Sequence, residues 1–238
     1  MAVISQQSVA HQTSQVHPVP PAANFTAADA EKWLGPHADE MARLYAMIIL
    51  ALPTRSRRRR SRIVQVMSSQ AAEGVSSIAL GLGVAAATTG RARTLFCDAR
   101  HTGDALTERP SLHDVVSGDA NLVDVVARHP QIGLEYCLLG TGTRQAALAL
   151  NENGLGPLFS ELRLLYDLVV IDAPPAHGSF IGLNLARRTD GVVLVVEAER
   201  TKAEMVRSTQ KLLRASGTKI LGVVLNRRRR GRPWFAGA

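Results

Sequence analysis

Two aspartates and one run of small and hydroxyl-bearing residues are the parts of this sequence that could do chemistry. The run, residues 63–77, reads IVQVMSSQAAEGVSS and ends in Gly74, Val75, Ser76 and Ser77. A strand, a small-residue loop and a helix in this order make a phosphate-binding loop, where backbone N–H groups hold phosphate, a lysine adds charge and a hydroxyl holds Mg²⁺. Here Val75 stands at the lysine position, and losing such a charged contact costs about 1.5–3 kcal/mol of binding. On spacing alone, a turn that binds no ligand is an equally good interpretation.

The two aspartates each end an apolar stretch. Asp98 closes TLFCD, and Asp172 closes LVVID and is followed by Ala-Pro-Pro. Open α/β sheets bind ligands beyond the carboxyl ends of their strands, so carboxylates there can hold Mg²⁺ or orient a water. If a nucleotide binds, we expect Ser76, Asp98 and Asp172 to be the Mg²⁺ ligands. The alternative is that both aspartates only bound the loops after their strands.

The elements that must position these residues are apolar runs separated by helical patterns. We expect strands at 63–67, 94–98, 134–139, 168–171, 192–196 and 220–225. We expect helices at 28–50 (cleanest from 38), 75–89, 112–116, 122–127, 155–165, 181–188 and 201–215, the last with Thr201 as N-cap and Glu204 as its capping-box partner. Continuous apolar strands alternating with helices predict an α/β fold with a parallel central sheet and helices on both faces.

The basic character of the chain is local. The net charge is +8, but eleven arginines form two clusters, one between Arg55 and Arg62 and one between Arg227 and Arg232, and the remainder is slightly acidic. Such clusters attract phosphates or anionic lipid, although solvated runs that aid solubility are the alternative. We divide the chain into a disordered tail (1–27), an N-terminal helix with an arginine-rich linker (28–62), an α/β domain (63–227) and a basic C-terminal tail (228–238).

Composition argues against several classes. Cys97 and Cys137 each lie in an apolar run without a CxxC neighbour, which predicts buried free thiols and a reducing compartment. The first thirty residues lack the pattern of a signal peptide, and the apolar run 45–52 is too short to span a bilayer. We therefore expect a cytoplasmic protein, with peripheral contact to the inner membrane as an open alternative. Aromatic residues are 4% of the chain, which disfavours nucleic-acid binding.

Five stretches carry a family resemblance. They are SSQAAEGVSS (68–77), TLFCDAR (94–100), LRLLYDLVVIDAPP (162–175), RTDGVVLVVEAERTKAE (188–204) and ILGVVLNR (220–227). In these residues the chain resembles the cytoplasmic kinase domain of bacterial tyrosine autokinases of the polysaccharide co-polymerase system. These kinases belong to the deviant-Walker P-loop class that also holds the MinD/ParA-like ATPases. The resemblance covers residues 63–227 and implies a P-loop NTPase-like fold.

The resemblance also implies roles for matching residues. Asp98 matches the first aspartate of the family's second acidic motif, and Asp172 matches its Walker B aspartate; both would be catalytic if the protein is active. The family's loop and its final Asn-Arg, near where a base would lie, imply nucleotide-binding roles for Glu73, Gly74, Ser76, Ser77, Asn226 and Arg227. On the helix from residue 38, Glu40 and Arg43 look like part of the motif with which such kinases form rings.

The departures from the family are systematic. Val75 replaces the lysine, Ala71 and Ala72 replace Pro-Gly, and Arg100 replaces a second aspartate. The tail after Arg227 contains no tyrosine, whereas autokinases of this class carry a tyrosine cluster there. Arg100 could instead supply charge lost at Val75, which is an open alternative. Together the losses predict a pseudokinase that kept the fold.

We therefore expect a tyrosine-autokinase-like protein without catalytic activity. It would support or regulate exopolysaccharide, capsule or holdfast biosynthesis and export together with a membrane chain-length or export protein. ATP or ADP and Mg²⁺ would be its cofactors only if the loop still binds nucleotide. The alternative is an active MinD/ParA-like ATPase or protein-tyrosine kinase in the same pathway; the ATPase would need a lysine from outside the loop.

The resemblance and the charge clusters also suggest partners. The expected partner is the cytoplasmic part of an inner-membrane polysaccharide co-polymerase or export protein, and the chain could form a homo-oligomer. The arginines from Arg55 to Arg62 and from Arg227 to Arg232 could contact an anionic membrane surface, where each basic residue is worth about 1 kcal/mol.

Overall fold

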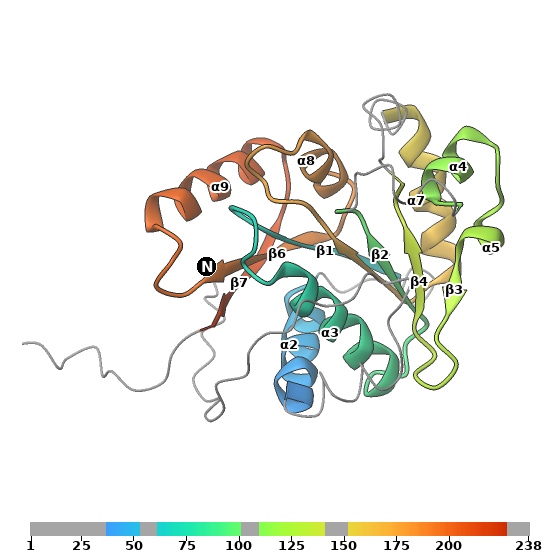
Figure 1. Cartoon of the computed structure of the whole chain (residues 1–238), viewed down its shortest axis with the longest axis horizontal. Coiled ribbons are helices and arrows are strands. Elements are labelled where there is room, and N and C mark those ends of the chain that lie inside the picture. Colours follow the sequence, from blue (N-terminus) through green and yellow to red (C-terminus); the bar gives the residue numbers. More distant parts are fainter. Residues whose placement is uncertain (1–36, 53–60, 101–109, 141–151, 228–238) are drawn as a thin grey trace, which may run out of the picture.

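The computed structural model describes residues 37–52, 61–100, 110–140 and 152–227. The expected tail 1–27, most of the first arginine cluster and the basic tail 228–238 lie outside the described residues. In the described part, a seven-stranded sheet has the order β3-β4-β2-β5-β1-β6-β7 (Figure 1). All neighbouring strands pair in parallel except β3 and β4, which are antiparallel. The predicted parallel α/β fold is confirmed.

The elements follow each other along the chain much as the apolar pattern predicts. The strands are β1 (Arg62–Ser68), β2 (Thr94–Asp98), β3 (Ala127–Arg128), β4 (Glu135–Leu138), β5 (Leu168–Asp172), β6 (Gly191–Glu197) and β7 (Ile220–Asn226). The helices are α2 (Ala38–Ala51), α3 (Val75–Thr88), α4 (Leu112–Ser117), α5 (Leu122–Val125), α7 (Glu152–Leu165), α8 (Phe180–Ala186) and α9 (Ala203–Ala215).

The central strands are buried on both faces. In β1, Ile63 and Met67 belong to one apolar cluster, whereas Val64 and Val66 belong to another. Because successive side chains of a strand point to opposite faces, two apolar clusters require helices on both sides of the sheet. Figure 1 shows α2 and α3 on one face and α4, α7, α8 and α9 on the other. The continuous apolar runs of the sequence are thus explained.

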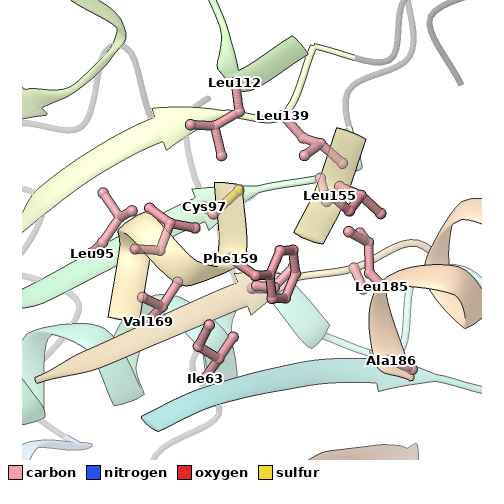
Figure 2. Close-up of a cluster of buried hydrophobic side chains, with 14 of the residues drawn as sticks. Ile63, Leu95, Cys97, Leu112, Leu139, Leu155, Phe159, Val169, Leu185 and Ala186 are labelled. Atoms are coloured by element: carbon pink, nitrogen blue, oxygen red, sulfur yellow. The ribbon is translucent and has the colours of Figure 1, made fainter. Parts of the chain in front are cut away.

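The larger cluster fills the space between the sheet and α4, α7 and α8. Figure 2 shows Leu112, Phe159 and Leu185 from these helices gathered over the strand residues. Cys97 lies in this cluster, and Cys137 is directly opposite it in the parallel pairing of β2 and β4. Both cysteines are buried free thiols, as the sequence predicts.

On the other face, α3 lies between the sheet and α2. Most α3 side chains are buried, and many of them are small, which lets the helix lie close to both neighbours. Met41, Leu44 and Ile48 of α2 are buried in the same cluster, at the spacing of one helix face. Tyr45 lies against Gly90, where a Cβ atom would come within 2.6 Å of its hydroxyl. A side chain at position 90 would therefore have to displace the Tyr45 ring.

Two sequence predictions about local structure are wrong. The helix expected at 201–215 begins at Ala203 with Lys202 as N-cap, so Thr201 is not the cap. The helix expected at 122–127 ends at Val125, and Ala127 lies instead in the short strand β3. In the part of the chain that the structure describes, no helix is long and apolar enough to cross a membrane.

Candidate functional site

The loop between β1 and α3 keeps the backbone shape of a phosphate-binding loop. Gly74 precedes α3 with φ +88°, a left-handed conformation that favours glycine. Ala72, which stands where the family has glycine, also has a positive φ of 66°. Such a conformation costs a non-glycine residue about 1–2 kcal/mol, so the surrounding contacts must hold it.

Glu73 supplies many of those contacts from inside the loop. Its side chain is fully buried. One carboxylate oxygen accepts hydrogen bonds from the backbone N–H groups of Ser69 (2.9 Å) and Gln70 (3.1 Å). The other accepts from the Glu197 N–H (3.4 Å) and from the Thr201 hydroxyl. Glu73 therefore fastens the loop to the end of β6, and this explains why Thr201 does not cap α9.

The end of β7 holds the loop from a second side. The Asn226 amide donates to the Glu73 carbonyl (2.9 Å), and the Arg227 guanidinium donates to the Ala72 carbonyl (3.0 Å). Arg227 also pairs with the Glu197 carboxylate at 3.2 Å. We call Glu73, Thr201, Asn226 and Arg227 the loop clamp. The clamp contacts show what these residues do in the structure, and the nucleotide-binding roles predicted for Glu73, Asn226 and Arg227 stay predictions.

The two predicted aspartates lie side by side in front of α3. Asp98 and Asp172 are register partners at the ends of β2 and β5. Both are buried, and Asp172 is 1% exposed. The Nε–H of Arg100 donates to Asp172 Oδ2 at 2.9 Å, and the Arg100 backbone N–H donates to Asp98 Oδ1. Arg100, predicted to stand at the position of a second aspartate, thus forms an ion pair with Asp172, the predicted Walker B residue.

The electrostatics of Asp172 reflect this enclosure. Burial raises the pKa of Asp172 to about 7, and the Asp98 carboxylate adds to the rise, whereas Arg100 opposes it. Ser76 lies close enough to lower the pKa of Asp172. Even so, Ser76 Oγ and Asp172 Oδ1 are buried atoms without a hydrogen-bond partner among the described residues, so their geometry is not that of a formed hydrogen bond.

A bound Mg²⁺ does not fit this arrangement. Ser76 and Asp172 offer the oxygen ligands that Mg²⁺ prefers, at a distance of about 2.0–2.1 Å. However, the Arg100 guanidinium already bonds the Asp172 carboxylate, so the ion would have to sit beside a fixed positive charge. At about 4 Å, two unit charges near a protein surface repel by about 4 kcal/mol, and a divalent ion doubles this.

Val75 is the residue that the sequence predicts to stand at the position of the phosphate lysine. It is the first residue of α3, is 7% exposed, and belongs to the apolar cluster between the sheet and α2. The first N–H groups of a helix have no partner within the helix, so α3 still presents donors toward the loop. Ser77, the second predicted hydroxyl residue, is buried in the same first turn.

The structure therefore places the predicted site residues in two groups. Ser76, Asp98, Asp172 and Arg100 surround the start of α3, whereas Asn226 and Arg227 contact the loop carbonyls. The part played by Thr201 had no signal in the sequence, because its partner Glu73 is 128 residues away.

A parallel sheet of this order, with a left-handed glycine before α3 and carboxylates at the ends of β2 and β5, defines a P-loop NTPase-like protein.

The homologues of the chain are bacterial tyrosine-protein kinases. EpsB of Ralstonia nicotianae, which carries the name of a tyrosine-protein kinase, is 30% identical over 159 residues, which are 64% of this chain and 21% of EpsB. The tyrosine-protein kinase CpsD of Streptococcus agalactiae is 25% identical over 174 residues, which are 70% of this chain and 76% of CpsD.

A third relative carries a different name. The succinoglycan biosynthesis transport protein ExoP of Rhizobium meliloti is 27% identical over 176 residues, which are 70% of this chain and 22% of ExoP. The chain therefore spans about a fifth of EpsB and of ExoP, and about three quarters of CpsD. No protein-family model matches the chain.

Solved structures agree on the fold. The kinase domain of VpsO superposes with a TM-score of 0.68 at 24% identity, covering 85% of this chain and 98% of that domain. The chimerical protein CapA2B2 gives a TM-score of 0.70 at 23% identity, covering 85% and 99%. The cell division ATPase MinD of Pyrococcus furiosus gives 0.58 at 23% identity, covering 72% and 74%. At these identities the likeness establishes the fold, and the resemblance expected from the sequence is confirmed at the level of homologues and fold.

Proposed function

We propose that this protein is a catalytically inactive relative of the bacterial tyrosine autokinases that supports the assembly and export of extracellular polysaccharide. The proposal rests on Val75, a buried apolar residue at the position that the family resemblance assigns to the phosphate lysine. Arg100 adds support, because it pairs with Asp172, the carboxylate on which catalysis in this class would depend. The loop clamp fixes the loop through contacts within the chain itself.

The engagement of Tyr166 in the fold adds further support. The three tyrosines of the chain are Tyr45 in α2, Tyr136 in β4 and Tyr166 directly after α7. Tyr166 is buried and donates to the Glu135 carboxylate at 2.7 Å, so its hydroxyl is already engaged.

The biological setting is proposed from the relatives. ExoP is named for succinoglycan biosynthesis and transport, and EpsB and CpsD carry the names of tyrosine-protein kinases. We infer a role in exopolysaccharide, capsule or holdfast formation on the cytoplasmic side of the inner membrane. The partner in this proposal is the cytoplasmic part of a membrane chain-length or export protein, and the arginine clusters add attraction to anionic lipid.

A phosphotransfer assay tests the loss of catalysis. Purified protein is incubated with labelled ATP and Mg²⁺, and phosphotyrosine is measured by mass spectrometry. We expect none from the wild type. Val75→Lys is the matched variant, because it restores the cation at the one position where the family has it. Phosphotyrosine made by the wild type, and lost in Asp172→Asn, would overturn the proposal.

Complementation tests the role in the cell. A deletion strain that lacks extracellular polysaccharide is supplied with the wild type or with Asp172→Asn. We expect both to restore the polymer to equal amounts, because a scaffold needs the fold and not the carboxylate. If Asp172→Asn accumulates as a folded protein and fails to restore polymer, the role depends on the Asp172 carboxylate and the proposal of a scaffold is wrong.

The alternative is an active ATPase, which the likeness to MinD and the unpartnered oxygens of Ser76 and Asp172 favour. It needs a lysine from outside the loop. In the described part of the chain, Lys202 and Lys211 belong to the cap and body of α9, and Lys219 donates to the Ala51 carbonyl. ATP hydrolysis that disappears in Asp172→Ala would establish this alternative, and an absence of hydrolysis would remove it.

A further inference from the structure

The Arg100–Asp172 pair has a chemical consequence beyond the loss of catalysis. Arg100 is 41% exposed while Asp172 is 1% exposed, so the guanidinium covers the carboxylate and still faces solvent. The hydrogen bond to Asp172 uses the Nε–H. A guanidinium has five N–H donors in a planar fork, so donors remain for a second anion.

The surroundings also point to an anion at this place. Arg100 meets Asp172 in front of the first turn of α3, a fourteen-residue helix whose N-terminal N–H groups favour negative charge. Ser76 in that turn has a buried hydroxyl oxygen without a hydrogen-bond partner among the described residues, and a hydroxyl can donate to an anion. The loop clamp and the left-handed Gly74 fix the backbone of the loop directly before this turn.

We propose that Arg100 takes the place of the divalent cation, so that the diphosphate group of a nucleotide binds at the start of α3 without Mg²⁺. Arg100 bridges the Asp172 carboxylate and the phosphate oxygens, as a metal ion would in a P-loop protein. This inference rests on the proposed function in one respect only, namely that the site binds without catalysing.

The charges decide between Mg²⁺ and Arg100. An aspartate at position 100 would add negative charge beside Asp98 and Asp172, and three carboxylates need a metal before a phosphate can approach. Arginine instead offsets the charge of Asp172 and adds a donor fork that matches phosphate geometry. A charge-assisted contact of this kind corresponds to about a 10- to 100-fold change in affinity.

Calorimetric titration of the whole chain with ADP, in EDTA and in Mg²⁺, tests the inference. We expect the dissociation constant to differ by less than about twofold between the two buffers, and ADP to raise the thermal midpoint in EDTA. An affinity that rises about tenfold or more with Mg²⁺ overturns the inference, as does an absence of ADP binding in both buffers. This comparison needs no variant, so it does not depend on how substitutions fold.

Variants then assign the effect to one side chain. Arg100→Gln should weaken ADP and pyrophosphate binding in EDTA by about 10- to 100-fold. Arg100→Asp should bind ADP only when Mg²⁺ is present. Arg128→Gln, an exposed arginine in β3 at the far edge of the sheet, removes the same charge from the chain and should leave binding unchanged. Unchanged pyrophosphate binding by a folded Arg100→Gln protein overturns the inference.

The outcomes separate this inference from the proposed function. If no ADP binds and no phosphotyrosine forms, the inference fails and the proposed function stands. If phosphotyrosine forms with Mg²⁺, the proposed function fails first. If ADP binds equally in both buffers and no phosphotyrosine forms, both hold.

Discussion

Asp172→Asn should make the folded chain less sensitive to pH. In the folded protein burial raises the pKa of Asp172 to about 7, whereas the ordinary value is 3.8. The folded state therefore binds this proton more tightly than the unfolded chain does. The stabilisation from Asp172 is complete below about pH 4 and is lost as the pH rises through about 7. A difference of about 3 pKa units corresponds to about 4 kcal/mol of unfolding free energy.

Asparagine has nearly the same shape and cannot ionise, so the difference between variant and wild type isolates the carboxylate. Urea unfolding at several pH values between about 4 and 8, followed by circular dichroism, gives both unfolding free energies by linear extrapolation. We expect the variant to gain about 4 kcal/mol relative to the wild type across this range. A difference that stays constant with pH, or that grows in favour of the wild type, would refute the reasoning.

The same urea unfolding at several pH values can be applied to the variant Arg100→Gln. Arg100 lowers the pKa of Asp172, so its removal should raise that pKa further. The loss of stability with rising pH should then extend to higher pH than in the wild type. If the transition moves to lower pH instead, Arg100 does not act on Asp172 as the 2.9 Å contact indicates.

Three further predictions concern stability, measured by urea unfolding. Tyr166→Phe should cost about 1–3 kcal/mol, because it leaves the buried Glu135 carboxylate without its hydroxyl donor; no change would show that water replaces the hydroxyl. Gly74→Ala should lower the free energy of unfolding by at least about 1 kcal/mol, because φ is +88° there and the new Cβ would meet a neighbouring side-chain amide. An unchanged free energy of unfolding would mean that the loop relaxes freely. Leu44→Ala should cost about 2–5 kcal/mol, whereas Leu50→Ala on the same helix, 84% exposed, should change stability by less than about 0.5 kcal/mol; equal effects would show that α2 is not packed on the domain.

The fold could be predicted because its strongest signals are local. The strand Thr94–Asp98 and the start of α3 at Val75 agree with the structure to the residue. A central parallel strand needs apolar side chains on both faces, so its sequence is a continuous apolar run. The short strand β3 escaped prediction because Ala127 and Arg128 are both exposed, and only their pairing with β4 makes them a strand.

Parts of the site could also be predicted, but the contacts between its side chains could not. That Asp98 and Asp172 would meet followed from the rule that parallel strands end at one edge of the sheet. The partner of Arg100 is 72 residues away, and nothing near Arg100 in the sequence indicates where its guanidinium points. Thr201 likewise fits the local pattern of an N-cap. Its hydroxyl instead donates to the Glu73 carboxylate, and this contact exists only in the folded chain.

The loop clamp has a consequence for the order of folding. The bond from Asn226 to the Glu73 carbonyl joins residues 153 positions apart, and the bond from Arg227 to Ala72 spans 155. Contacts of such high sequence separation form after local structure, because closing a long loop costs entropy before the contact repays it. The loop should therefore reach its final shape only when β7 has joined the sheet. In hydrogen exchange, the amide proton of Glu197, which donates to the Glu73 carboxylate 124 positions away, should gain protection late in refolding, together with those of the last strand.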